Sequence, residues 1–200
     1  MMITVQNIAC FNFEGALRGM RNPLESWAKS DSVWQNGTYI VGPNDNDLAL
    51  RLVRSGSDHA KFMRQILVCM DITAPLYWYK EFDTYKVATV ANSTSTMHKL
   101  GSRNLTQADF SWDSITPFRQ QYLEHINSLI AVWRNNKTEE NFRALVQDLL
   151  DSYNQTRTVT LNYATLRNMY FARKSHKLAE WRSFCDTIRS LEHSEWIIAE

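Results

Sequence analysis

The chain has 200 residues, of which 44% are hydrophobic and 22% are charged, and its formal net charge is +1 at pH 7. This length and this apolar content predict one globular domain over residues 1–200. The near-neutral balance of charge gives no whole-chain reason to expect nucleic acid or an acidic membrane surface as a partner.

The cysteines and the N-terminus bear on the cellular compartment. Cys10, Cys69 and Cys185 are odd in number and lack CxxC spacing, so neither a disulfide framework nor a zinc site is expected. The opening MMITVQNIAC lacks the basic lead and the long apolar core of a signal peptide, and no apolar run approaches membrane-spanning length. The sequence therefore predicts a cytoplasmic protein with no metal site and no membrane partner.

The N-terminal part of the chain carries alternating strand and helix signals. Residues 3–5 alternate as in a short strand, and apolar residues recur at helical spacing over 13–20. An Asn-Gly turn signal precedes the β-prone residues 38–41. The segment GPNDND that follows is predicted to be a loop that caps the next helix through Asn46, and Gly56 ends that helix.

The middle of the chain changes from strand to helix. Residues 66–70 are an unbroken apolar run, long enough for a strand that is buried on both faces. Pro75 suits the first turn of a helix, with Thr73 as its cap. Aromatic residues then recur at i, i+4 and i+7, namely Trp78, Phe82 and Tyr85. Residues 92–113 are polar and lack a period, which predicts an excursion on the surface.

The C-terminal half is mostly helical. Apolar residues at helical spacing over 118–133 and a second helix starting at Thr138 predict a helical hairpin. Residues 156–161 alternate as a short strand, and Asn162 marks the switch into a helix. A final helix is predicted over 178–191. The fold class is therefore α+β, a single domain with a small β-sheet packed with several helices.

One helical stripe near the C-terminus carries polar residues at both of its ends. Asn162, Leu166, Met169 and Arg173 follow at i, i+4, i+7 and i+11, so the polar pair brackets an apolar face over about 16 Å. A phosphate suits the planar guanidinium fork of Arg173. An ordinary salt bridge or a snorkelling side chain is the alternative.

Two segments resemble the flavin-dependent thymidylate synthases. In that family a histidine precedes, by a fixed interval, an A/C-P pair and a motif of the form R-H-R-x-x-S. His59, Ala74-Pro75 and the triplet at 84–86 have matching intervals in this chain. The motif residues differ, because Thr84, Tyr85 and Lys86 replace its first three residues and Thr89 replaces its serine.

The second segment, LNYATLRNMYFAR, resembles the family's C-terminal helix, whose two asparagines and one arginine contact flavin or nucleotide. Arg143 lies in a segment similar to the family's E-x-x-R, and Glu81 takes the place of a glutamine near the substrate. The resemblance implies that FAD contacts His59, Thr84, Tyr85, Lys86, Asn162 and Asn168. It implies that the nucleotide contacts Glu81, Arg143 and Arg173, and it assigns no catalytic residue.

The activity implied by the resemblance is reductive methylation at C5 of dUMP, or of a related pyrimidine deoxynucleotide. Its cofactor would be FAD, its co-substrates NADPH and methylenetetrahydrofolate, and its assembly a homotetramer. The altered motif leaves two alternatives open. One is different nucleotide or C5 chemistry on the same scaffold, and the other is a catalytically inactive nucleotide-binding or flavin-binding homologue that serves in binding or assembly.

Overall fold

The computed structural model describes residues 3–200, and it divides into two compact units. Unit 1 comprises Ile72–Thr84 and Asn92–Thr158, together with the chain up to Thr4. Unit 2 comprises Val5–Asp71, Tyr85–Ala91 and Val159–Glu200.

The main sheet has four strands in the order β1-β4-β6-β5. The strands are β1 (Thr4–Phe11), β4 (Leu67–Pro75), β5 (Val90–Ser93) and β6 (Asn154–Asn162). Alternate residues of β4, from Val68 to Ala74, are at most 1% exposed, because successive side chains of a strand point to opposite faces and one of these faces is covered. Sheet and helices together confirm the α+β class.

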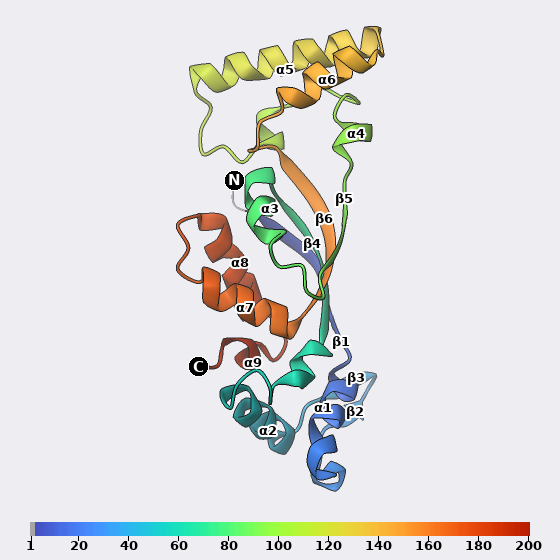
Figure 1. The fold of residues 1–200 in the computed structure, drawn as a ribbon, viewed down its shortest axis with the longest axis vertical. Coiled ribbons are helices and arrows are strands. Elements are labelled where there is room, and N and C mark those ends of the chain that lie inside the picture. The colour runs from blue at the N-terminus through green and yellow to red at the C-terminus, as the bar shows by residue number, and fades with distance from the viewer. Residues whose placement is uncertain (1–2) are drawn as a thin grey trace. The chain divides into compact units, whose positions relative to one another are not determined.

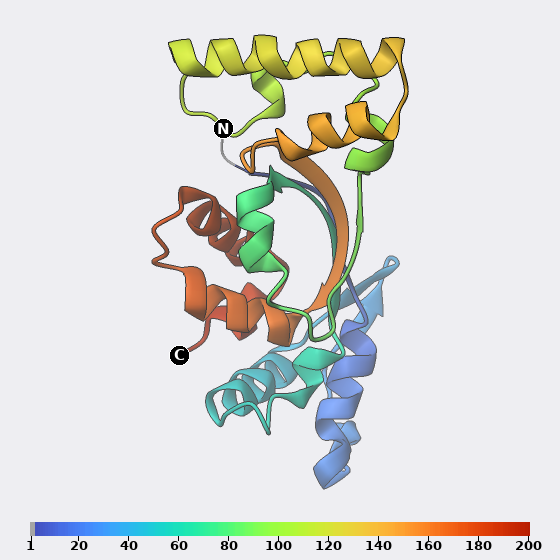
Figure 2. The ribbon, with the colours of Figure 1, turned by 45° about the horizontal axis from the view of Figure 1, so that its top comes forward.

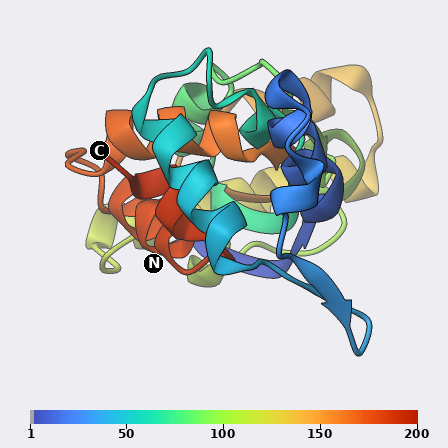
Figure 3. The same cartoon turned by 90° about the horizontal axis from the view of Figure 1, so that it is seen from below.

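Unit 2 contains five helices among its described residues. They are α1 (Phe13–Arg21), α2 (Pro43–Arg54), α7 (Tyr163–Arg173), α8 (Ala179–Arg189) and α9 (Ser194–Ile198). The last three pack on one another (Figure 1). Short 3-10 turns cover Asn22–Leu24, Trp27–Lys29 and Lys61–Arg64. The hairpin of β2 (Val33–Gln35) and β3 (Thr38–Ile40) extends away from α1 and α2 (Figure 3).

Unit 1 is organised around a helical hairpin. Its helices are α3 (Leu76–Phe82), α4 (Thr96–Lys99), α5 (Pro117–Asn135) and α6 (Glu139–Gln147), with a 3-10 turn at Gln107–Asp109. Helices α5 and α6 lie side by side (Figure 2). Their apolar faces share one core with four residues of the preceding segment, which are Leu100, Leu105, Phe110 and Trp112. The predicted hairpin is confirmed, and the Thr138 hydroxyl caps α6 by accepting the Asn141 N–H.

The structure corrects the predicted start of the helix after β4. Strand β4 continues to Pro75, and α3 begins only at Leu76. Thr73 therefore lies within the strand, where its hydroxyl is 2.7 Å from that of Thr156, and it caps no helix. Tyr85 lies beyond the end of α3 at Phe82 and is not part of its aromatic stripe. Strand propensity and sheet pairing outweighed the helical preference of the proline ring here.

Two other predictions about loops were wrong. The segment GPNDND is not a loop capped by Asn46, because α2 begins at Pro43 with Gly42 as its N-cap. Residues 92–113 are not only a surface excursion, since the end of β5, all of α4 and several core residues fall within them. Helix α9 had no predicted counterpart, because only five residues form it.

Candidate functional site

A cavity of about 590 Å³ in unit 2 is formed by three stretches that are distant in the sequence. These are the chain from the end of α2 to the 3-10 turn at 61–64, the loop at 87–88, and the first turns of α7. Its lining residues are Val53, Gly56, Ser57, Ala60, Met63, Arg64, Val87, Ala88, Asn162, Ala164, Thr165, Arg167 and Asn168. We call it the α7 cavity. Its volume is typical of a site for a small ligand or cofactor.

The start of α7 is fixed by side-chain and backbone hydrogen bonds. Asn162 is the N-cap, and its side-chain oxygen accepts the Thr165 N–H at 2.9 Å. The Tyr163 N–H donates to the Ile66 carbonyl at 3.1 Å, and the buried Tyr163 hydroxyl donates to the Glu192 carbonyl. Helix α7 therefore meets the cavity with its N-terminal end, where its dipole favours an anion.

The loop at 87–89 is held against α7 in a strained conformation. The Thr165 hydroxyl donates to the Val87 carbonyl at 3.0 Å. Ala88 has φ +54°, the left-handed region that residues with a Cβ adopt rarely. The Thr89 hydroxyl oxygen is buried and has no hydrogen-bond partner among the described residues. Strained backbone and an unsatisfied polar atom are each features that concentrate at ligand sites.

Positive charge dominates the lining of the α7 cavity. Arg64 and Arg167 line it, and none of the described lining residues is Asp or Glu. Arg167 donates to the carbonyls of Ile197 at 2.8 Å and Ala199 at 2.6 Å. Burial lowers the pKa of Arg167, but an arginine remains charged at neutral pH. The cavity is therefore suited to an anionic ligand.

Three of the residues predicted to contact FAD lie on or beside this cavity. Asn162 and Asn168 both line it. Lys86 is exposed and directly precedes the lining residue Val87. The part of the motif from 86 to 89 and the Asn-bearing helix are thus brought together, although they are more than 70 residues apart in the sequence.

Tyr85 and Arg173 meet each other instead of lining this cavity. The Arg173 Nε donates to the Tyr85 hydroxyl at 3.0 Å, and the guanidinium lies 4.8 Å from the centre of the Trp181 ring. The rings of Tyr85 and Trp181 pack edge to face at 6.0 Å. Tyr85, in the position of the motif's histidine, therefore anchors an arginine that the sequence analysis placed at the nucleotide.

His59 lies in the same turn as Gly56 and Ser57, yet it lines a neighbouring cavity of about 430 Å³ with Asp58 and Lys61. The remaining three predicted residues belong to unit 1. The Thr84 hydroxyl donates to the carbonyl of Glu81 at 2.7 Å, and Arg143 is exposed on α6. These three make no contribution to the α7 cavity.

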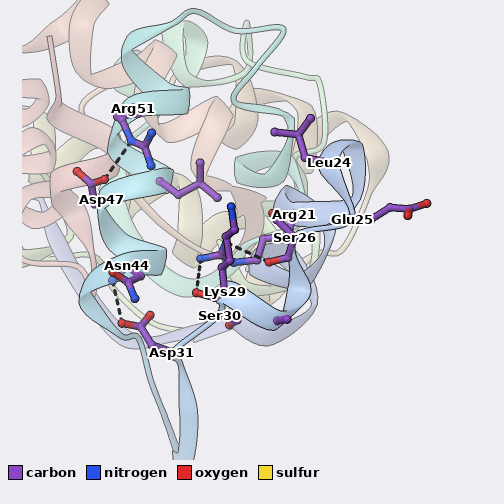
Figure 4. A pocket seen from close by; sticks show the side chains of 12 residues that line it. Arg21, Leu24, Glu25, Ser26, Lys29, Ser30, Asp31, Asn44, Asp47 and Arg51 are labelled. Atoms are coloured by element: carbon purple, nitrogen blue, oxygen red, sulfur yellow. Dashed lines mark hydrogen bonds and ion pairs between the residues drawn. The ribbon is translucent and has the colours of Figure 1, made fainter.

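A larger cavity of about 750 Å³ in unit 2 contains none of the predicted residues (Figure 4). Several of its charged side chains are already engaged. Asp47 pairs with Arg51 at 3.0 Å, and an Asp31 oxygen accepts the Asn44 N–H at 2.9 Å. Arg21 donates to the carbonyl of Lys29 at 3.1 Å. These contacts stabilise the start and the exposed face of α2, so size alone does not identify the site.

Within residues 3–200, no group of three or more His, Cys, Asp or Glu residues is arranged to hold a metal ion. No described helix is both long enough and apolar enough to cross a membrane. The three cysteines are free thiols, and burial raises the pKa of Cys185 to about 11.

Sequence reasoning missed Arg64, Arg167 and Thr165 as lining residues. Nothing in the sequence singles out Arg64, because a lone arginine carries no periodic signal. Thr165 and Arg167 lie between the two predicted asparagines. Residues 162–168 form the start of one helix. This shared position is the signal by which Thr165 and Arg167 could have been predicted to line the same cavity as the two asparagines.

Comparison with solved structures finds the same fold in enzymes of known activity. A flavin-dependent thymidylate synthase ThyX from Helicobacter pylori, complexed with FAD and dUMP, matches with a TM-score of 0.75 at 14% identity, covering 100% of this chain and 98% of that one. A second structure of the Helicobacter pylori enzyme with FAD and dUMP gives 0.74 at 13% identity, covering 100% and 97%.

A UMP/dUMP methylase, PolB, from Streptomyces cacaoi bound with 5-Br dUMP matches with a TM-score of 0.61 at 14% identity, covering 94% of this chain and 88% of that one. No family model matches the sequence, and no curated protein matches it either. At these identities the likeness concerns the fold. This chain has the fold of the flavin-dependent thymidylate synthases over its full length.

Proposed function

We propose that this protein binds FAD in the α7 cavity and methylates a pyrimidine deoxynucleotide at C5, as flavin-dependent thymidylate synthases do. Residues 1–200 form one domain of that type, and four copies assemble into the active protein. The co-substrates are NADPH and methylenetetrahydrofolate. One observation carries the proposal: Asn162 and Asn168 line a single cationic cavity together with Val87 and Ala88, the two residues between Lys86 and Thr89 of the altered motif.

The residues of the cavity fit a phosphorylated flavin. Its lining combines apolar groups such as Val53 and Met63 with amides and two guanidinium groups, which suits an apolar ring system joined to phosphates. The first turn of α7 adds its positive dipole end. When bound, the flavin would supply hydride to the C5 substituent. The protein's own groups orient the ligand and exclude water around it.

A second candidate is a flavin-binding or nucleotide-binding homologue that no longer catalyses the reaction. The Tyr85 contact with Arg173 favours it, since both groups are used within the protein. Thr84 likewise donates to a backbone carbonyl instead of offering the positive charge of an arginine. In this case the cavity still binds its ligand but catalyses no reaction. The function of the protein then lies in that binding or in its assembly.

Flavin binding is tested on purified protein by its visible absorption and by its thermal unfolding with and without FAD. The expected result is a yellow protein, or a colourless one that FAD stabilises by about 2.7 kcal/mol at a concentration one hundred times Kd. Asn168→Ala should weaken FAD binding, while the same change at exposed Asn44 on α2 should leave it unchanged. A colourless protein that FAD does not stabilise would contradict both candidates as flavoproteins.

The two candidates differ in turnover. Tritium release from C5-labelled dUMP, with NADPH and methylenetetrahydrofolate present, is expected of the enzyme and not of the silent homologue. A UMP arm is included, because the methylase from Streptomyces cacaoi acts on UMP as well as dUMP. Flavin binding with no release from either nucleotide would favour the second candidate.

A further inference from the structure

Two arginines, Arg64 and Arg167, line the α7 cavity. They differ in whether the guanidinium already has hydrogen-bond partners in the protein. We infer that Arg64 is the residue that binds the phosphate of the cavity's ligand, a role that neither the family likeness nor the sequence pattern assigns to it. The inference rests on the proposed function in that it takes the ligand to be phosphorylated. The chemistry recognised is a phosphate or pyrophosphate group.

Arg167 is occupied by the chain itself. One of its terminal nitrogens donates to two backbone carbonyls near the C-terminus, those of Ile197 and Ala199. Its guanidinium carbon also lies 4.7 Å from the centre of the Phe171 ring. Turning this group toward a ligand would leave two carbonyls without their donor, so Arg167 serves mainly to fix the C-terminal segment against α7.

Arg173 is occupied as well. Its Nε donates to the Tyr85 hydroxyl, and its guanidinium packs on the rings of Trp181 and Tyr85. It does not belong to the lining of the α7 cavity. The arginine that the sequence analysis assigned to the nucleotide phosphate is therefore engaged in holding α7, α8 and the motif segment together.

Arg64 has neither kind of engagement. No hydrogen bond or ion pair of its guanidinium to any residue from 3 to 200 is present, and the side chain is exposed at the cavity. The 3-10 turn at Lys61–Arg64 is anchored by the side chains of Phe62 and Met63, which are both buried. The backbone that carries Arg64 is thus rigid, while its fork remains available for two parallel hydrogen bonds to an oxyanion.

The surroundings of Arg64 reinforce this assignment. Ser57 on the preceding turn offers a hydroxyl, and the N-terminal end of α7 lines the same cavity. No described lining residue is a carboxylate that would neutralise the guanidinium or repel an anion. Exposed charges separated by more than a Debye length are largely screened, so a phosphate gains from Arg64 only when it lies close to the guanidinium.

The phosphate has two possible sources, the flavin cofactor and the nucleotide substrate. Four probes separate them: FAD, riboflavin, dUMP and deoxyuridine, each titrated by fluorescence or calorimetry against wild type, Arg64→Ala and Arg64→Lys. Arg54→Ala is the matched control, because Arg54 is exposed at the end of α2 and outside the cavity. Thermal unfolding of each variant checks that it folds.

The expected result is a loss of about 10- to 100-fold in affinity for one phosphorylated probe in Arg64→Ala, with no change for its unphosphorylated partner. A loss for FAD alone assigns the pyrophosphate of the cofactor, and a loss for dUMP alone assigns the nucleotide phosphate. Arg64→Lys should recover part of the affinity, because it keeps the charge and loses the fork. Raising the salt concentration should narrow the gap between wild type and Arg64→Ala.

Equal affinities of wild type and Arg64→Ala for every probe would overturn the inference while leaving the proposed function intact. If wild type binds neither FAD nor dUMP, the proposed function fails, and inorganic pyrophosphate then decides the inference alone. A rise in unfolding temperature with pyrophosphate that Arg64→Ala lacks would support a phosphate site at Arg64. The same rise in both proteins, or a rise in neither, would refute it.

Discussion

Arg21 and Asp45 form a buried ion pair in unit 2, with side chains that are 5% and 0% exposed. The Asp45 carboxylate accepts the Arg21 Nε at 2.6 Å on one oxygen, and the hydroxyls of Ser30 at 2.6 Å and Ser32 at 2.5 Å on the other. All of these groups join α1, α2 and the chain between them. The buried Asp45 carboxylate is tolerated here because both of its oxygens accept hydrogen bonds and Arg21 neutralises its charge.

Removing the charge of Asp45 should therefore be severe. Asp45→Asn leaves the Arg21 guanidinium buried without its counter-ion, and we expect the free energy of unfolding to fall by about 3–5 kcal/mol. Denaturant unfolding at pH 7 measures the change. Asp47→Asn on the same helix is the control, because its pair with Arg51 is exposed and should contribute less than about 1 kcal/mol.

The same pair gives a dependence on pH. Burial raises the pKa of Asp45, but the hydrogen bonds from Ser30, Ser32 and Arg21 outweigh it, so the pKa lies below its usual value of 3.8. A lowered pKa in the folded protein stabilises it above the pKa of the unfolded chain, and this contribution disappears as the pH falls below about 4. The difference between wild type and Asp45→Asn should shrink from pH 5 to pH 3. A constant difference would contradict the lowered pKa, because it would mean that Asp45 binds protons equally in the folded and the unfolded chain.

At the level of elements, α7 has two functions at its N-terminus: Asn162 caps the helix, and it lines the cavity. Asn162→Ala should cost about 1 kcal/mol of stability through loss of the cap, and Asn162→Ser should restore it, because a serine oxygen can accept the Thr165 N–H. Unfolding experiments on both variants measure this. Asn168→Ala, on the exposed surface of the same helix, should leave stability within about 0.5 kcal/mol.

This pair of variants separates folding from binding. If Asn162→Ser is as stable as wild type but binds FAD more weakly, the amide contacts the ligand directly. If it binds FAD normally, the role of Asn162 is confined to the cap. A destabilised Asn162→Ser would contradict the assigned hydrogen bond.

Elements with a strong period were predictable and those set by tertiary contacts were not. Helices α1 and α5 and the hairpin turn at Asn36-Gly37 follow local patterns, and the structure confirms them. The prediction of a surface excursion over residues 92–113 was wrong. Leu100, Leu105 and Phe110 are isolated apolar residues in the sequence, and they are buried only because they pack against α5. The predicted helix start at Pro75 was wrong for a similar reason, since the position of Pro75 at the end of β4 depends on pairing with the neighbouring strands.

The candidate site was predictable in part. Asn162 and Asn168 share one helix, so their common cavity follows from spacing. The pairing of Tyr85 with Arg173 joins residues 88 positions apart, and no local pattern encodes it. Arg64 was missed because an unpaired arginine can be distinguished from a paired one only when its neighbours in space are known.

At the scale of the whole molecule, the chain passes repeatedly between units 1 and 2, and the altered motif falls at one such passage. Thr84 ends a stretch of unit 1, whereas Tyr85 to Ala91 belong to unit 2. Of the residues that the family likeness assigns to ligand binding, Glu81, Thr84 and Arg143 therefore belong to unit 1, and the other six belong to unit 2. A single cooperative unfolding transition is what the proposed single domain requires.

The edge of the sheet indicates where copies of the chain associate. Strand β5 is an edge strand, and all four of its residues are exposed. Val90 in this strand is 67% exposed, and Val87 in the loop before it is 82% exposed. Apolar side chains on an open strand edge are unfavourable in a monomer, since they promote pairing with other chains. They are therefore expected to be covered in the proposed homotetramer.

Light scattering during gel filtration should give a mass of about four times the 23.4 kDa of the chain. Val90→Lys should shift the protein to smaller species, because a lysine on an edge strand opposes pairing with another copy. Ser93→Lys adds the same charge to the same strand without removing an apolar group, and it should shift the mass less. A monomeric wild type would refute the tetramer. A tetramer that persists in Val90→Lys would move the interface away from β5 and leave the exposure of Val87 and Val90 unexplained.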